Sequence, residues 1–286
     1  MGKHSVEELY DIVSDLVKWA SSSSVPYSQR LEEHLVGVAC FRDKPRTLSL
    51  MEIIDKTTPE GAVGIDAGAG TGILGWSFLN AGGGYLYLVE SMGVYRKFLE
   101  RVAKELGFED MVEVHIVNAA KFKPAKRLDY IVAELVITGL LNEPLVEVIK
   151  HLRQYANPEC RFLPEKAVSK VELWGRVEHE GKQAIIPLSS DGVVYDEVEV
   201  RSIERDGVDT VVEFEVDTAG LPNKLVATTE LIHPGGYKTG MFDTLCTPMT
   251  MYLDSVRGRR VREGDRVKVR INYKYGETKT WASLVE

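Results

Sequence analysis

Cysteine and histidine are scarce in this chain. Among 286 residues there are three cysteines, Cys40, Cys160 and Cys246, and six histidines. The cysteines are odd in number and widely separated, so the sequence has neither a disulfide framework nor the paired-cysteine spacing of a zinc site. The histidines form no H-x-x-x-H pair. We therefore expect no metal ion and a reducing, cytoplasmic location.

Long apolar runs are missing as well. No apolar stretch has the length that is needed to span a bilayer. The opening residues MGKHSV lack the apolar segment of a signal peptide, and Val6 stands where a myristoylation signal needs Ser or Thr. The composition is 44% hydrophobic and 27% charged, as in ordinary globular domains. We expect no membrane partner.

Positive charge is also in deficit, because 35 Lys and Arg face 43 Asp and Glu and leave a net charge of -8. An acidic chain repels nucleic acid unless its basic groups gather on one face. One basic cluster occurs, formed by Arg257, Arg259, Arg260, Arg262, Arg266, Lys268 and Arg270. Much of it lies in the alternating segment RVKVRINYKY, so we interpret it as solvent-facing strand positions. Binding of an acidic partner such as RNA stays open as the alternative.

Three helices are expected at the beginning of the chain. Apolar residues recur with helical spacing over 6–19, a second helical stretch covers about 27–38, and a third covers 47–54 after Pro45. The run Ser21–Ser24 interrupts the first pattern. This part of the chain is therefore predicted to be helical.

Strand and helix alternate after Gly61. Strands are predicted at 62–66, 85–90, 112–117 and 130–134, and helices at about 71–80, 93–106 and 143–155. Apolar strands separated by helices indicate a parallel sheet with helices on both faces. Right-handed crossovers then place the carboxyl ends of the strands at one edge, where ligands bind. The fold class of this part is α/β and Rossmann-like.

The pattern changes again after Pro164. Alternating segments rich in β-branched residues are separated by turn signals such as Asp191-Gly192 and Asp206-Gly207. Strands are predicted at 168–174, 193–203, 210–216, 225–232, 249–253, 266–275 and 278–284. This spacing favours an antiparallel β-barrel or sandwich. We therefore expect N-terminal helices over 1–56, a Rossmann-like domain over 57–163 and a β-barrel domain over 164–286.

A glycine-spaced turn follows the first predicted strand. Asp66 ends that strand, and Gly68, Gly70 and Gly72 follow before an apolar helical segment begins. Glycines at such a turn let the backbone approach a ligand where a Cβ atom would collide. The dinucleotide pattern G-x-G-x-x-G is not met, because its sixth position is Ile73. The motif D-x-G-x-G-x-G resembles the first motif of class I S-adenosylmethionine-dependent methyltransferases, which implies S-adenosyl-L-methionine as the cofactor.

Two further strand ends carry candidate cofactor ligands. Glu90 ends the second predicted strand about twenty residues after the glycine turn, where a Rossmann-like domain places an acid that accepts both ribose hydroxyls. Asn118 and Ala119 end the third strand, where this class frames the adenine. We further expect Asp66 to meet the amino group of the methionine part. These assignments place one nucleoside across three neighbouring strands.

The fourth predicted strand runs into a loop that is bracketed by Glu134 and Glu143. An acid at a helix start is common for electrostatic reasons alone, so the pair is the informative feature. Two carboxylates can hold a planar guanidinium through bidentate hydrogen bonds, and one of them can accept the proton that leaves. The pair resembles the double-glutamate loop of protein arginine methyltransferases. That resemblance implies methyl transfer to an arginine nitrogen, with Glu134 and Glu143 as catalytic residues.

Other segments resemble the same family. FRDKPRTL is similar to its D-x-x-R-T helix, which implies that Arg46 binds the methionine carboxylate. Tyr27-Ser28-Gln29 resembles the aromatic lid helix over the cofactor, and Leu163–Ala167 resembles the junction with the β-barrel. The stretch Gly236–Phe242 falls where the family has its threonine–histidine–tryptophan loop, which implies that Tyr237 and Phe242 contact the substrate. The resemblance therefore covers most of the chain.

Alternatives remain beside this hypothesis. The substrate loop lacks the family's usual Trp-Met-Gly, and the predicted barrel is short for a helical dimerisation arm. We therefore leave the oligomeric state open, with a homodimer as one option beside a protein or peptide substrate. A methyltransferase for a small molecule or RNA is the second hypothesis, although Ala133–Val136 does not match the Asn/Asp-Pro-Pro-aromatic motif for nucleobase amines. A non-catalytic scaffold that retains the fold is the third.

Overall fold

The computed structural model describes residues 4–32, 35–241, 246–254 and 260–285. The chain forms two compact units that are each built from several segments. The first unit contains residues 1–135, 147–165 and 233–237, and the second contains 136–146, 166–232 and 238–286. Within the described ranges, no helix combines the length and the apolar character that crossing a membrane requires.

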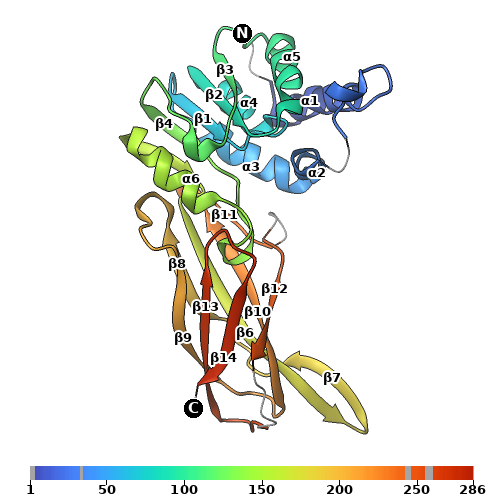
Figure 1. Cartoon of the computed structure of the whole chain (residues 1–286), viewed down its shortest axis with the longest axis vertical. Helices are drawn as coiled ribbons and strands as arrows, with labels where there is room; N and C mark the ends of the chain where they lie inside the picture. The colour runs from blue at the N-terminus through green and yellow to red at the C-terminus, as the bar shows by residue number, and fades with distance from the viewer. Residues whose placement is uncertain (1–3, 33–34, 242–245, 255–259, 286) are drawn as a thin grey trace. The chain divides into compact units, whose positions relative to one another are not determined.

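The first unit contains a five-stranded sheet in which every pairing is parallel (Figure 1). Its order is β3-β2-β1-β4-β5. The strands are β1 (Val63–Ala67), β2 (Tyr85–Glu90), β3 (Val112–Ile116), β4 (Leu128–Val132) and β5 (Ala156–Leu163). The first four were predicted to within two residues at each end. The fifth was missed because Pro158, Glu159 and Arg161 interrupt its apolar pattern. An edge strand such as β5 can contain a proline and charged residues.

Helices surround this sheet. They are α1 (Val6–Ala20), α2 (Val36–Arg42), α3 (Lys44–Thr57), α4 (Ile73–Asn80), α5 (Arg96–Leu106) and α6 (Leu145–Leu152). Ser5 and Glu8 form a capping box that begins α1. The single helix predicted over 27–38 is wrong, because a short 3-10 turn, η1 (Tyr27–Gln29), ends where Arg30 becomes extended, and α2 begins only at Val36.

Further 3-10 turns connect the elements. They are η2 (Gly93–Tyr95), η3 (Ala119–Lys121), η4 (Thr138–Leu140), η5 (Arg153–Tyr155), η6 (Val200–Ser202) and η7 (Pro234–Gly236). Two of them continue helices that the sequence predicts as longer: η2 precedes α5 directly, and η5 follows α6 directly.

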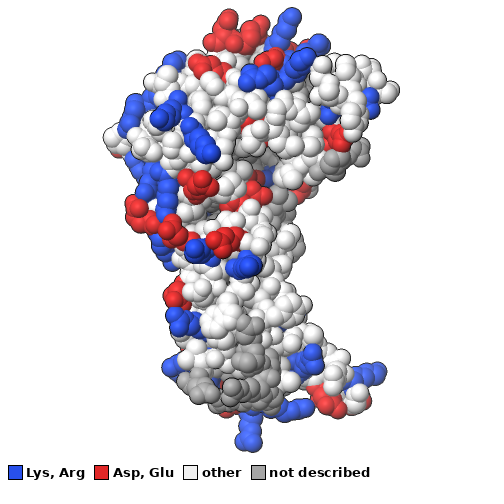
Figure 2. Space-filling model, viewed as in Figure 1, with Lys and Arg blue, Asp and Glu red and all other residues white. Residues whose placement is uncertain are grey.

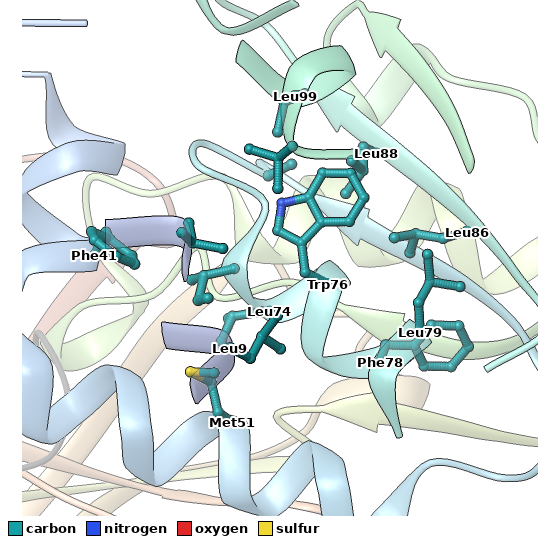
Figure 3. Packing of buried hydrophobic residues seen from close by; sticks show 14 of the residues in the cluster. Leu9, Phe41, Met51, Leu74, Trp76, Phe78, Leu79, Leu86, Leu88 and Leu99 are labelled. Carbon is teal, nitrogen blue, oxygen red and sulfur yellow. The ribbon is translucent and has the colours of Figure 1, made fainter. Parts of the chain in front are cut away.

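One hydrophobic core lies between the helices and one face of the sheet (Figure 3). Helices α3 and α4 contact each other, and α1 packs across both. Trp76 of α4 is fully buried, and its indole N–H donates to the carbonyl of Thr71 at 3.1 Å. Leu88 of β2 and Leu99 of α5 lie beside its ring in Figure 3. Burial of this large ring ties the helix after the glycine turn to the sheet.

The second unit is a curled β-sheet. Its main path is β7-β6-β10-β12-β14-β13-β9, with β8 paired to β6 and β11 paired to β10. The strands are β6 (Lys166–His179), β7 (Lys182–Pro187), β8 (Val193–Glu199), β9 (Gly207–Glu215), β10 (Leu221–Ile232), β11 (Lys238–Thr239), β12 (Met249–Asp254), β13 (Arg266–Lys274) and β14 (Thr280–Val285). Strands β8 and β9 also contact each other, so the sheet bends toward a barrel.

Two features of this sheet differ from the sequence prediction. Strands β12 and β14 are parallel, whereas all other pairings in the sheet are antiparallel. The β6–β7 hairpin and the short β11 were not predicted. Strand β7 is exposed along almost its whole length, so it has no alternation of buried and exposed residues for the sequence to signal.

The basic side chains of β13 are on the exposed face of the sheet. Its residues alternate strictly between exposed and buried positions. Arg270 binds Asp209 of β9 through two hydrogen bonds of 2.8 and 2.7 Å, and Arg266 pairs with Glu213 at 3.0 Å. Figure 2 shows basic and acidic side chains interspersed on the face in view. The neighbouring strand thus supplies opposite charges; Arg257 and Arg259 lie outside the described residues.

Candidate active site

The glycine turn crosses the carboxyl end of β2. Gly68, Gly70 and Gly72 have φ angles of 82°, 52° and 75°, which side chains other than glycine adopt at a cost. The amides of Gly68 and Ala69 both donate to the carbonyl of Val89, at 2.8 and 3.1 Å. Helix α4 begins directly after Gly72. The turn therefore has a defined conformation that glycine makes accessible.

Protein groups approach these glycines closely. A Cβ atom on Gly70 would lie 3.1 Å from the Cα atom of Gly37 in α2. A Cβ atom on Gly68 would lie 2.5 Å from a methyl group of Leu135. Helix α2 and the residue after Glu134 therefore both pack directly on the glycine turn. This packing brings the N-terminal helices to the carboxyl edge of the sheet.

Three acids belong to the carboxyl edge of the parallel sheet, and two of them share one face of it. Side chains alternate along a strand, so Asp66 of β1 and Glu90 of β2 share the face that α3 and α4 cover, and Glu134 follows two residues after Val132 of β4. Asp66 is 3% exposed, and its Oδ2 accepts a hydrogen bond from the Gly75 amide at 2.9 Å. Burial, with smaller contributions from Glu90 and Glu134, raises the pKa of Asp66 to about 7.

Glu90 is held by backbone donors at the end of β2. Its Oε2 accepts from the Gly70 amide at 2.8 Å, and its Oε1 accepts from the Met92 amide at 2.9 Å and from the Ser91 hydroxyl at 3.2 Å. The side chain is buried. These bonds orient the carboxylate beside the glycine turn.

Arg46 and Glu134 form a buried ion pair. Arg46 comes from α3, and its Nη2 binds Oε2 of Glu134, while its Nη1 donates to the carbonyl of Cys40 at 3.2 Å. The two side chains are 5% and 8% exposed. A buried pair loses much hydration, so removing either partner leaves a poorly solvated charge and is costly. The pair joins α3 to the segment that leaves β4.

The remaining predicted ligands of the first unit are more exposed, with the exception of Ala119. Asn118 is exposed and its Oδ1 accepts from the Ala120 amide at 2.8 Å, while Ala119 is buried. Tyr27 is 75% exposed, and the Arg30 guanidinium carbon lies 5.9 Å from its ring centre. Tyr237 is partly exposed, with Nζ of Lys56 5.6 Å from its ring centre.

Two predicted residues are separate from this group. Glu143 belongs to the second unit, whereas Glu134 belongs to the first. Glu143 is half-buried, and burial raises the pKa of its carboxyl. Phe242, predicted as a substrate contact, lies outside the described residues.

Sequence reasoning missed Gly37 and Tyr95. A Cβ atom on Gly37 would lie 2.7 Å from the Tyr95 hydroxyl oxygen and 2.9 Å from Cα of Gly70. Gly37 thus lets α2 approach the glycine turn, although glycine is a poor helix former. An isolated glycine in a helical pattern could have suggested a close contact. The contact is with Gly70, 33 positions further along the chain, and local sequence cannot identify so distant a partner.

Fold and site together define a class. A parallel sheet carries a glycine turn after β1 and acids at the ends of β1 and β2, and a separate β-unit follows. This is the architecture of a Rossmann-like α/β domain that is combined in one chain with a curled β-sheet domain. The chain matches no known family model.

Solved structures of protein arginine methyltransferases share this fold. The Trypanosoma brucei PRMT1 enzyme-prozyme heterotetrameric complex with AdoHcy aligns over 82% of this chain and 86% of its own, with a TM-score of 0.64 and 18% identity. The structure of PRMT6 with SAH aligns over 85% of this chain and 97% of its own, with a TM-score of 0.69 and 13% identity. The chain therefore has the protein arginine methyltransferase fold, as the sequence predicted.

Two of the sequence relatives are named methyltransferases, and each of them aligns with less than half of this chain. An arginine N(omega)-methyltransferase of Streptomyces achromogenes subsp. streptozoticus is 28% identical over 134 residues, which cover 45% of this chain and 37% of that protein. Protein arginine N-methyltransferase 6 of Danio rerio is 30% identical over 126 residues, which cover 42% of this chain and 36% of that protein. An uncharacterized protein of Methanocaldococcus jannaschii is 24% identical over 82% of this chain and 90% of its own. The chain thus matches little more than a third of the two named methyltransferases.

Proposed function

We propose that this protein is an S-adenosylmethionine-dependent methyltransferase that transfers a methyl group to a guanidinium nitrogen of arginine in a protein or peptide. The observation that carries the proposal is the cluster of Asp66, Glu90 and Glu134 beside the glycine turn, with Arg46 as the counter-charge. Arg46 and Asp66 suit the carboxylate and the ammonium group of the methionine part of S-adenosylmethionine, and Glu90 suits its ribose hydroxyls. Glu134 is then left to face a positively charged acceptor.

The residues fit the cofactor group by group. Arg46 would bind the methionine carboxylate, and Asp66 would meet the ammonium group. The oriented carboxylate of Glu90 would accept the ribose hydroxyls, and Asn118 with Ala119 would frame the adenine. When bound, the cofactor supplies a methyl group already activated by a sulfonium. The helical segment before residue 57, including Tyr27, would cover it as a lid.

Glu134 and Glu143 would then hold the acceptor. Two carboxylates that grip one guanidinium draw positive charge onto the nitrogens they bind, so the remaining nitrogen stays the better nucleophile. Glu143 is the better candidate for the proton acceptor, because burial raises the pKa of its carboxyl whereas Arg46 already occupies Glu134. Tyr237 and Phe242 are the proposed further contacts to the substrate.

Methyl transfer from radiolabelled S-adenosylmethionine to an arginine-rich peptide tests the proposal. We expect Glu143→Gln to lower kcat by about 100-fold or more while cofactor affinity, measured by calorimetry, stays unchanged. Glu134→Gln should lower both, because it also removes the partner of Arg46. Glu147→Gln is the matched control, since Glu147 is exposed on α6. Full activity in the two active-site variants would contradict the mechanism.

The alternatives are separated by changing the acceptor. Free L-arginine is the second acceptor to assay, because the Streptomyces relative is named an arginine methyltransferase without mention of a protein. Salt-dependent binding and methylation of RNA would favour the nucleic-acid reading, against which the paired charges of β13 and β9 argue. No binding of S-adenosylmethionine would leave a scaffold. The cytoplasmic location and a homodimer stay predictions.

A further inference from the structure

The loop that carries Glu143 has an unusual backbone. Within residues 136–146, Gly139, Leu140 and Asn142 all have positive φ angles, of 71°, 56° and 57°. For leucine and asparagine this conformation costs energy, so it persists where surrounding contacts enforce it. Thr138, Leu140 and Leu141 are nearly fully buried. The second unit therefore holds this loop firmly.

The firmest contact is a pair of buried hydroxyls. The Gly139 amide donates to Oγ1 of Thr229 at 2.9 Å, and that oxygen lies 2.8 Å from Oγ of Ser169. The two side chains are 2% and 1% exposed. Thr229 of β10 and Ser169 of β6 are directly opposite each other in the antiparallel pairing. Two hydroxyls in an apolar interior are costly unless they are hydrogen-bonded, and here each has a partner.

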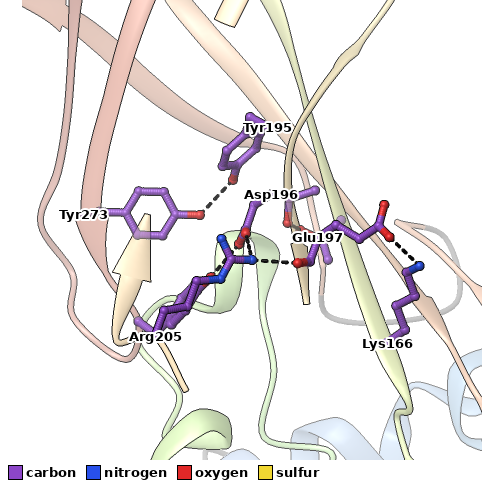
Figure 4. A network of polar contacts seen from close by, with 9 residues as sticks. Lys166, Tyr195, Asp196, Glu197, Arg205 and Tyr273 are labelled. Carbon is purple, nitrogen blue, oxygen red and sulfur yellow. Dashed lines mark hydrogen bonds and ion pairs between the residues drawn. The ribbon is translucent and has the colours of Figure 1, made fainter. Parts of the chain in front are cut away.

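Two tyrosines close the other side of Gly139. A Cβ atom at this position would lie 3.0 Å from the Tyr273 hydroxyl oxygen and 3.2 Å from that of Tyr195. The two hydroxyls are hydrogen-bonded at 3.0 Å, and Figure 4 marks this contact with a dashed line. Two independent reasons therefore favour glycine at position 139. Its φ angle is positive, and the tyrosine hydroxyls leave little space for a Cβ atom. We call Ser169, Thr229, Tyr195 and Tyr273 the loop seat.

Further hydrogen bonds fix the loop on both sides of the seat. The Thr138 hydroxyl donates to the Thr247 carbonyl at 2.6 Å, and the Gly276 amide donates to the Leu140 carbonyl at 2.8 Å. The Asn142 amide, next to Glu143, donates to the Glu277 carbonyl at 3.3 Å. The loop is thus attached to the β13–β14 turn as well as to the seat.

We infer that the loop seat positions Glu143 for the acceptor, so that Thr229 and Ser169 are positioning residues of the active site. The inference rests on the proposed function and adds to it a role for buried residues of the second unit. Glu143 follows Gly139 by four residues, and each of the hydrogen bonds above limits how the loop can turn. A carboxylate that must grip a planar cation loses much of its effect when it shifts by about 1 Å.

Thr229→Val tests the inference, because it removes the hydroxyl and keeps the side-chain shape. We expect the Gly139 amide to exchange with solvent deuterium at least about 10-fold faster and kcat on the arginine peptide to fall at least about 10-fold, with cofactor affinity unchanged. Thr229→Ser keeps the hydroxyl and should restore both values. Thr228→Val is the matched control, since Thr228 is the neighbour on β10 and is only partly buried. It should behave like the wild type.

Several outcomes overturn the inference. Unchanged exchange in Thr229→Val means that the seat does not hold the loop, and faster exchange without a loss of kcat means that holding the loop does not position Glu143. If Thr229→Val does not fold, Ser169→Ala, which leaves the Thr229 oxygen in place, must still speed exchange of the Gly139 amide above the control. A wild-type chain that binds S-adenosylmethionine but methylates no arginine overturns the proposed function instead, while exchange still decides whether the seat holds the loop.

Discussion

Asp66 illustrates how a single residue depends on the fold around it. The sequence places an acid before a glycine turn, which is a pattern that predicts ligand binding. The structure buries this acid under the first turn of α4, where one backbone amide bonds to it. Its pKa is raised to about 7, so part of the population is protonated near neutral pH when no cation is bound.

This pKa predicts a pH dependence of stability. The folded-state pKa lies above the unfolded value of 3.8, so the unfolded chain loses this proton first as pH rises. The contribution of Asp66 is therefore fully present below about pH 4 and is lost by about pH 7, with a slope of up to about 1.4 kcal/mol per pH unit. Asp66→Asn should be more stable than the wild type at pH 7 and should flatten this slope in urea unfolding between about pH 4 and pH 7. Equal slopes in both proteins would contradict the raised pKa.

At the scale of elements, the Arg46–Glu134 pair joins a helix to the end of a strand. Arg46 comes from α3, and Glu134 leaves β4. The Gly37 contact similarly joins α2 to the glycine turn. Each of these contacts holds one helix at a defined position, α3 at the end of β4 and α2 at the glycine turn.

The ion pair predicts a large difference between two similar substitutions on α3. Arg46→Met leaves Glu134 buried without its counter-charge, and we expect a loss of about 3–5 kcal/mol in the free energy of unfolding. Lys56→Met on the same helix breaks an exposed pair with Glu52, whose side chains are 51% and 54% exposed, and should cost less than about 1 kcal/mol. Urea unfolding monitored by circular dichroism measures both. Similar losses in the two variants would show that burial of the Arg46 pair adds nothing.

At the scale of the whole molecule, the chain consists of two compact units. The predicted cofactor ligands, Asp66, Glu90 and Arg46 among them, belong to the first unit, and the loop with Glu143 belongs to the second. The two carboxylates of the proposed mechanism are therefore anchored differently, Glu134 by Arg46 and the loop of Glu143 by the β-sheet.

This division predicts how a ligand changes stability. S-adenosylhomocysteine at about 100 times its Kd should stabilise the part that binds it by about 2.7 kcal/mol. Hydrogen exchange should slow at the ends of β1 and β2 in the first unit and stay unchanged in β6 and β10 of the second. Adenosine, which lacks the groups proposed for Arg46 and Asp66, is the control and should protect less. Equal protection of both units would mean that they unfold as one.

The sequence predicted the regular elements well where hydrophobic period and element coincide. The 85–90 strand was predicted at its observed bounds, and the basic residues of β13 were interpreted as solvent-facing strand positions, which they are. It failed where polar residues interrupt the pattern, as in β5, where both faces of a strand are exposed, as in β7, and where Arg30 ends a helical-looking stretch after three residues. These errors have one cause: local spacing carries no signal when neither face of an element is continuously buried.

The sequence by itself determined the α/β and β character of the two parts, the glycine turn and the acids at successive strand ends, because these depend on periodicity and on residues close together in the chain. Only the tertiary structure decided which distant residues contact the predicted site residues and loops. The partner of Glu134 is 88 residues away, and that of the Gly139 amide is 90 residues away. Long-range contacts arise from packing between elements, which local propensity does not encode.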